Sequence, residues 1–370
     1  MSVLFHPRVA WQILTVGLTV LPLSLAAQVA PVDANPTWRD ANDAVGQYPR
    51  GHADVLKWEK SNPPPAAAPE LPPGSLALRT PGDAIRQAWL AHVDLVMPLL
   101  RLGPVNAELI ASGRWLELDP RLLRTVDGID DVLTVAVQGK TAWLEAVAAR
   151  QILQYHREAL GATEAAAELG QRMVRVGNWS ALQQTQVQLA RSSAQANLRR
   201  AQYAATQAQA RLLKTLRLTG VHASVALADE LPQVPAQALA PGEWQQRIAQ
   251  VQAQLSRTER IHNQANLALA WDAYLTSHAL AQGARYEVLK VREFITEETV
   301  LHYNGMLKSV WDLLEEVRNQ SQAAIDAIGA QRDYGIAEID LQWVLQGGTP
   351  ENFVVLGSGG VGEASAAAGH

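Results

Sequence analysis

Two long stretches without proline, each divided by a short glycine turn, constrain the fold of this chain more than any other feature. The first covers residues 129–218 and is interrupted at Gly177-Asn178, and the second covers residues 243–346 and is interrupted at Asn304-Gly305. Both are rich in alanine and leucine, which favour helix. Because a turn of two residues between long helices makes them antiparallel, each stretch predicts a helical hairpin.

The two predicted hairpins share one plan. Gly177 and Gly305 are 128 residues apart, and the same offset pairs Leu213 with Leu341. This spacing predicts a helix–turn–helix unit that is used twice. Between residues 187 and 216, apolar side chains, mostly alanine, recur at steps of three or four, as in a coiled-coil seam. We therefore predict an all-α protein built from elongated antiparallel coiled-coil hairpins.

Composition divides the rest of the chain into segments. Prolines cluster between residues 63 and 73 and again between residues 232 and 241, where they indicate a spacer and a linker. Thr80-Pro81-Gly82-Asp83 is typical of a helix start. The predicted organisation is a signal peptide at 1–27, a disordered proline-rich segment at 28–79, a first hairpin repeat at 80–220, a linker at 221–242, a second hairpin repeat at 243–348 and a disordered tail at 349–370.

The N-terminal residues have the three parts of a secretory signal. Arg8 supplies the positive charge, residues 13–25 form an apolar run that is too short to span a bilayer, and Ala26 or Ala27 offers a cleavage site. The alternative is an uncleaved anchor. The chain has no cysteine, which excludes disulfides and N-terminal lipidation. We expect an exported protein of the outer membrane or periplasm.

Charge argues against a nucleic-acid partner. The chain carries 31 basic and 36 acidic residues, with a net charge of −5, and the basic residues are scattered. Nucleic-acid binding requires a concentrated basic stripe. After the signal, no window approaches about 18 consecutive apolar residues, so no transmembrane helix is predicted.

No catalytic, cofactor or metal site is predicted. Residues 357–362 have the GxGxxG spacing, but only eight residues follow Gly362, too few for the helix that dinucleotide binding needs. The nine histidines include no pair at a spacing of three or four, as a helical metal site would require. No GxSxG motif marks a nucleophile.

Several segments resemble the TolC-like outer-membrane efflux protein family, over about residues 76 to 348. The opening helix at 76–89 is similar, as are residues 172–180 and 198–220 of the first hairpin. Arg332-Asp333-Tyr334 and residues 337–341 follow in family-like order. The most specific segment resembles a variant found among heavy-metal- and copper-associated members; it is Tyr303-Asn304-Gly305-Met306-Leu307-Lys308-Ser309-Val310-Trp311-Asp312-Leu313-Leu314.

This resemblance implies a homotrimeric duct without chemistry of its own. In the family, helices form a periplasmic tunnel that docks onto a periplasmic adaptor protein and an inner-membrane pump. The resemblance therefore implies efflux in a tripartite export system, with metal ions as one candidate cargo.

The sequence departs from the family in its strands. Family members also supply two β-hairpins per protomer to a membrane barrel, and such strands need about 9–11 residues of alternating character. Residues 102–125 contain only a weak alternation at Trp115-Leu116-Glu117-Leu118, and residues 243–303 are interpreted as one unbroken helix with Gly283 as the one obvious breaker. We therefore expect little or no β-barrel. The alternative function is a soluble periplasmic helical scaffold or interaction protein without a pore.

Three carboxylates follow the second turn. Asp312, Glu315 and Glu316 share one side of the predicted helix. In a trimer they would form an acidic ring at the tunnel mouth, favouring cations. The alternative is a solvated face near a helix N-terminus, where the dipole stabilises carboxylates.

Large apolar residues flank both turns. Trp179 follows the first turn, and Met306 and Trp311 follow the second. Exposed aromatic residues often anchor protein interfaces, so these residues are candidates for adaptor contact. Packing between helices at the tip is the alternative.

Overall fold

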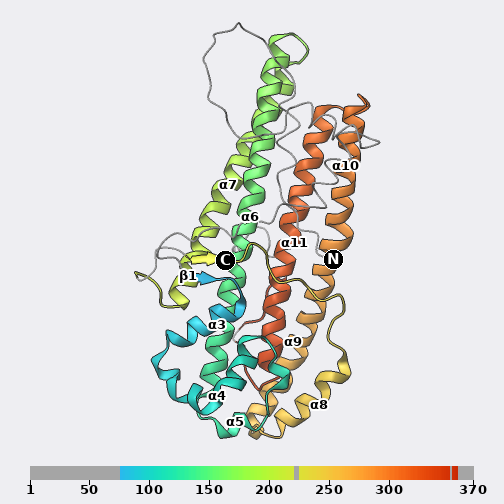
Figure 1. Ribbon diagram of the computed structural model, residues 1–370. Helices are drawn as coiled ribbons and strands as arrows, with labels where there is room; N and C mark the ends of the chain where they lie inside the picture. Colours follow the sequence, from blue (N-terminus) through green and yellow to red (C-terminus); the bar gives the residue numbers. More distant parts are fainter. Residues whose placement is uncertain (1–75, 221–224, 351, 357–370) are drawn as a thin grey trace, which may run out of the picture. The chain divides into compact units, whose positions relative to one another are not determined.

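The computed structural model describes residues 76–220, 225–350 and 352–356 (Figure 1). The chain divides into two units, Met1–Pro73 and Gly74–His370, and all described residues belong to the second. The predicted signal peptide, nearly all of the proline-rich segment, and the tail beyond residue 356 lie outside the described residues.

The first hairpin consists of α6, Ile129–Arg175, and α7, Ala181–Thr215. With 47 residues, α6 is about 70 Å long at 1.5 Å per residue. The two helices pack against each other along their length. The fold prediction, an all-α protein of antiparallel helical hairpins, is confirmed in the described part of the chain.

The second hairpin has an interrupted first arm. This arm comprises α9, Arg257–Gln282, the π-helix η3, Gly283–Leu289, and α10, Lys290–Asn304. The return arm is α11, Val310–Val344.

The prediction of one unbroken helix over residues 243–303 is wrong. A separate helix, α8 at Pro241–Gln252, precedes α9. The break follows from a capping box, because the Ser256 side chain accepts from the Glu259 backbone N–H and the Glu259 side chain accepts from the Ser256 backbone N–H. These bonds satisfy the free donors of a new helix start.

The four arms form a single layer. In Figure 1, α6 and α11 lie side by side, α7 packs on the outer side of α6, and α9 and α10 pack on the outer side of α11. The layer order is therefore α7, α6, α11, then α9–α10. At the central contact, a Cβ on Gly335 would lie 3.0 Å from Leu144 Cδ1, so α11 approaches α6 closely there.

Short elements cover the end of the layer where α6 begins. They are α3 at Pro81–Leu90, η1 at Val93–Leu95, α4 at Val96–Ala111, η2 at Trp115–Glu117 and α5 at Leu122–Thr125. Thr80 and Asp83 form a capping box at the start of α3. Instead of ending near Gly103-Pro104, α4 continues through a kink at Gly103, whose φ is 78°. The weak alternation at residues 115–118 is a 3-10 turn with Trp115 fully buried.

A short parallel sheet joins the start of the unit to the linker. β1, Leu76–Leu78, pairs with β2, Val225–Leu227, with Leu76 opposite Val225. The Trp143 indole N–H donates to the Leu78 carbonyl at 2.8 Å, which ties this sheet to α6. No sequence pattern predicted these three-residue strands.

The two hairpin turns have the same backbone geometry, but with a shifted register. In the first turn, Gly177 has φ 78° and the Asn178 N–H donates to the Met173 carbonyl. In the second, Met306 has φ 59° and the Leu307 N–H donates to the His302 carbonyl. Both are Schellman-type ends. Gly305 has φ −80°, so Met306, not Gly305, occupies the position of Gly177.

The π-helix accounts for this shift. The helix starts capped by Gly128 and Ser256 are 128 residues apart, whereas the N-caps after the turns, Ser180 and Ser309, are 129 apart. A π-turn closes i→i+5 hydrogen bonds and so takes in one residue more than an α-turn. The extra residue of the second hairpin is therefore absorbed at η3.

We predict that the two turns respond oppositely to substitution. Met306→Gly should raise the free energy of unfolding by about 1 kcal/mol, because a left-handed backbone conformation strains any residue with a Cβ. Gly177→Ala should lower it by a similar amount, since a Cβ there would meet nothing within 4 Å and only the backbone strain acts. Urea denaturation followed by circular dichroism measures both changes.

Gly305→Ala is the matched control. Its negative φ accepts a Cβ, so this variant should be neutral or slightly stabilising. A loss of stability in Gly305→Ala comparable to that of Gly177→Ala would contradict the assignment of Met306 to the left-handed position.

Candidate functional site

The tips of the two hairpins meet through a pair of indole rings. Trp179, at the start of the α7 arm, stacks on Trp311, in the first turn of α11, with ring centroids 4.0 Å apart and an angle of 28° between the planes. Both side chains are half-buried. A Cβ on Gly170 of α6 would lie 3.0 Å from Trp179 Cζ3. The predicted contact residues Trp179 and Trp311 therefore pack on each other and on α6.

The residues around the turns expose large apolar side chains. The exposed fraction is 94% for Met306 and 76% for Leu307 in the second turn. In the first hairpin it is 70% for Val176 and 68% for Leu182. Gly177 and Asn178, and Asn304 and Gly305, lie at the two turns themselves and are exposed. The two tips thus form an apolar surface that the described residues leave uncovered.

The three carboxylates after the second turn have different surroundings. Asp312 Oδ2 accepts from the Ser309 backbone N–H at 2.8 Å and from its Oγ at 2.7 Å, and these hydrogen bonds lower the pKa of Asp312. Glu316 pairs with Arg292 of α10 at 3.3 Å. Glu315 is exposed and lies 3.9 Å from Arg318. Two of the three thus have local partners, as a helix cap and an interhelical ion pair.

Buried polar groups that sequence reasoning did not single out lie between the helices. Lys140 of α6 pairs with Glu338 of α11 at 2.9 Å, and its side chain is 9% exposed. The Tyr334 hydroxyl donates to Glu338 Oε1 at 3.3 Å. His278 of α9 donates from Nε2 to the Pro235 carbonyl at 2.8 Å. Lys140 is the cation in an otherwise apolar run, which is the signal that would have found it.

Asp340 of α11 is an unusual carboxyl group. It is 6% exposed, and burial raises the pKa of its carboxyl to about 7. Desolvation favours the neutral acid, so this side chain carries a proton at mildly acidic pH.

Within the described ranges, no group of three or more histidine, aspartate or glutamate side chains could hold a metal ion. None of the helices in that part of the chain combines the length and apolar character needed to cross a bilayer. The GxGxxG segment at 357–362 lies outside the described residues.

Comparisons give likenesses to solved structures alone. No protein-family model matches the chain, and no curated protein matches it. A membrane protein from Pseudomonas aeruginosa superposes with a TM-score of 0.45 at 13% identity, over 66% of this chain and 72% of that one. CusC, from crystal structures concerned with folding and transmembrane channel formation, gives a TM-score of 0.47 at 14% identity, over 72% of this chain and 96% of that one.

We predict that the two tip indoles are energetically coupled. A double-mutant cycle with Trp179→Ala and Trp311→Ala should give a coupling free energy of about 0.5–1.5 kcal/mol, the usual range for an aromatic pair. Urea denaturation of the four proteins supplies the values. Trp179→Ala with Trp271→Ala is the control pair, because Trp271 packs on Trp244 and Tyr274 instead. Additive losses for Trp179 and Trp311 would refute the coupling.

We predict that Asp340 makes stability fall as pH rises. Since its folded pKa lies above its unfolded value, the folded state binds more protons between about pH 4 and 7, and stability is lost across that window. Asp340→Asn should be more stable than the parent at pH 7.5 and close to it at pH 4. Asp326→Asn, at an exposed position on the same helix, is the control and should leave the pH profile unchanged.

Proposed function

We propose that this chain is an exported component of an efflux system. Three copies would join their hairpins into a helical duct, and the tips of the duct would dock onto a periplasmic adaptor protein and an inner-membrane pump. The proposed role is conduction, without a chemical step. The duct would lie in the periplasm or at the outer membrane. Metal ions are the cargo that the resemblance to heavy-metal-associated members favours.

One observation carries this proposal. α7 has 35 residues, yet its buried residues are Ala201 and Leu212 alone. A helix in water is stabilised mainly by packing of an apolar face. A long helix at the edge of a layer with so little of its surface covered is typical of an arm that packs against another protein chain.

Both edges of the layer expose apolar side chains. On α7, Leu182, Leu189 and Tyr203 are 68%, 71% and 70% exposed, and their spacing in multiples of seven puts them on one side of the helix. On the opposite edge, exposed apolar residues follow one another along α9, η3 and α10; they are Leu269, Leu275, Leu280, Tyr286, Val288, Val291, Phe294 and Leu301.

Two different edges favour head-to-tail association. The α7 edge of one copy would meet the α9–α10 edge of the next, and repetition of such a contact closes a ring when the rotation permits. Self-pairing of one edge would leave the other uncovered. A ring covers both edges in every copy, and the family resemblance gives three as the number of copies.

The exposed tip fits the second half of the proposal. Met306, Leu307 and Val176 would contact the adaptor, while the Trp179–Trp311 stack holds the two turns side by side. Glu315 would remain as the exposed carboxylate near the tip, available to an acidic ring of three copies. Asp312 and Glu316 would contribute less, because their carboxylates serve the helix cap and the Arg292 ion pair.

The test is the oligomeric state of the purified full chain. We expect about three times the 40.1 kDa chain mass, less any cleaved signal, by sedimentation equilibrium. Leu189→Glu with Tyr203→Glu should convert the assembly to monomers, because it places charges on the apolar edge. Gln195→Glu, an exposed position on α7 off that side, should leave the assembly intact.

A monomer of the unaltered chain at micromolar concentration in the periplasmic fraction would overturn the duct. It would favour the alternative, a soluble helical scaffold or interaction protein. A trimer that persists in the double-glutamate variant would reject the α7 edge as the interface while leaving efflux open.

A further inference from the structure

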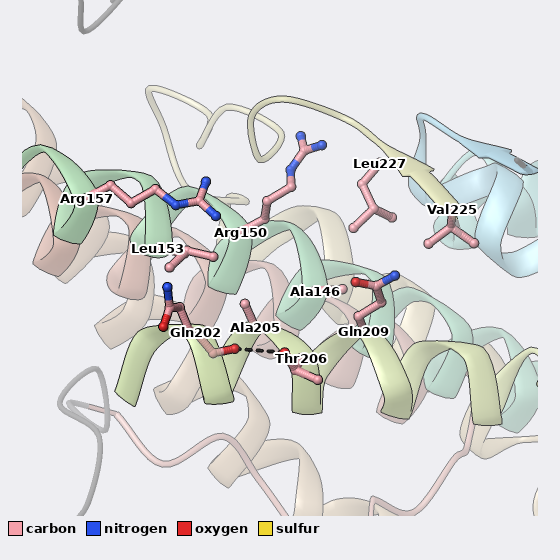
Figure 2. Close-up of a pocket in the computed structure, with 10 residues that line it drawn as sticks. All are labelled: Ala146, Arg150, Leu153, Arg157, Gln202, Ala205, Thr206, Gln209, Val225 and Leu227. Carbon is pink, nitrogen blue, oxygen red and sulfur yellow. Dashed lines mark hydrogen bonds between the residues drawn. The ribbon is translucent and has the colours of Figure 1, made fainter. Parts of the chain in front are cut away.

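A groove on the first hairpin carries two cationic side chains and no acidic one. It lies between α6 and α7 beside β2 and encloses about 280 Å³. Figure 2 shows its lining, which consists of Ala146, Arg150, Leu153, Arg157, Gln202, Ala205, Thr206, Gln209, Val225 and Leu227. In a chain with a net charge of −5, such a lining concentrates positive charge locally.

Arg150 is held at the wall of the groove by the linker. Its Nη2 donates to the Ala228 carbonyl and to Asp229 Oδ1, the latter at 3.1 Å. The side chain thus fastens the segment after β2 to α6. Its charge is partly balanced by Asp229, whose side chain is 92% exposed and screened by water.

Arg157 differs from Arg150 because it has no hydrogen bond or ion pair with any described residue. It is two turns further along α6, and in Figure 2 its side chain runs toward Arg150, over Leu153. A guanidinium offers five N–H donors in a planar fork that matches a carboxylate or another oxyanion. These donors face the groove and are free for a ligand.

The α7 wall supplies polar groups that are also uncommitted. The side-chain amides of Gln202 and Gln209 line the groove, and neither is bonded to a described residue. Thr206 is different, since its hydroxyl donates to the Gln202 backbone carbonyl at 2.9 Å (Figure 2). The available polar groups are therefore one free guanidinium and two amides.

The remainder of the lining is apolar. Leu153 is 9% exposed and lies under the Arg157 side chain, with Ala205 opposite on α7 and Leu227 on β2. The groove thus combines a cationic end with an aliphatic surface. Its volume falls just below the roughly 300–1,000 Å³ of pockets for drug-sized ligands, so a smaller ligand fits.

We propose that this groove binds a small amphiphilic anion, with an oxyanion head on Arg157 and a short aliphatic chain along Leu153, Ala205 and Leu227. Arg150 adds positive charge at the adjoining wall. Because arginine stays protonated at all physiological pH values, binding persists as long as the head group is ionised. The site is independent of the proposed trimer, since Leu182, Leu189 and Tyr203 of the α7 edge are not among its lining residues.

The test is calorimetric titration of the full chain with octanoate, below the concentration at which it aggregates. Arg157→Gln should weaken binding about tenfold or more, which corresponds to about 1.4 kcal/mol for a charge-assisted hydrogen bond. Ala205→Phe should abolish binding by filling the aliphatic surface. Arg172→Gln, an exposed arginine on the same helix outside the groove, should bind octanoate like the unaltered chain.

The neutral analogue 1-octanol separates anion recognition from apolar association. We expect it to bind at least tenfold more weakly than octanoate. Equal binding of the two compounds, unchanged affinity in Arg157→Gln, or no saturable heat with octanoate would each overturn the proposal. Circular dichroism of each variant checks that helix content is retained.

Discussion

The contact between α6 and α11 is the interaction on which the rest of the structure depends. These two arms belong to different hairpins, and all other elements pack on them directly or through a neighbour. The absence of a side chain at Gly335 lets α11 approach Leu144, and close approach increases the dispersion contacts of the aliphatic residues on both helices. The buried Lys140–Glu338 pair fixes the register of the two arms, since removal of either partner would leave a poorly solvated charge.

Much of this architecture was predictable because its determinants are local. Gly177, Ser180 and Ser309 act through the backbone of their own turn, and the capping boxes of Ser180 and Ser309 involve residues three positions away. Such signals are legible in a sequence. The offset of 128 residues was one short at the tips for the opposite reason. A π-helix has no distinctive composition, so an insertion inside a continuous helix cannot be located by matching glycines.

The parts that escaped prediction depend on residues distant in the chain. The groove is lined by Arg150 and Arg157 of α6, Gln202 of α7 and Leu227 of the linker, and their proximity follows from tertiary packing. The same holds for the Trp179–Trp311 stack, which brings together two tips separated by the whole linker. The short strands β1 and β2 have no alternating pattern long enough to recognise. For Asp340, burial between helices, not its neighbours in sequence, sets the protonation behaviour.

The π-helix has a consequence for how the two halves of the molecule can diverge. One residue added to a regular α-helix turns everything after it by about 100°, which would move the apolar side of α10 away from α11 and the Trp311 tip. The wider turn at Gly283–Leu289 takes up this rotation locally, so the contacts on either side keep their partners. The two arms can therefore differ in length while their ends stay level, and changes near the base of one hairpin need no matching change at its far end.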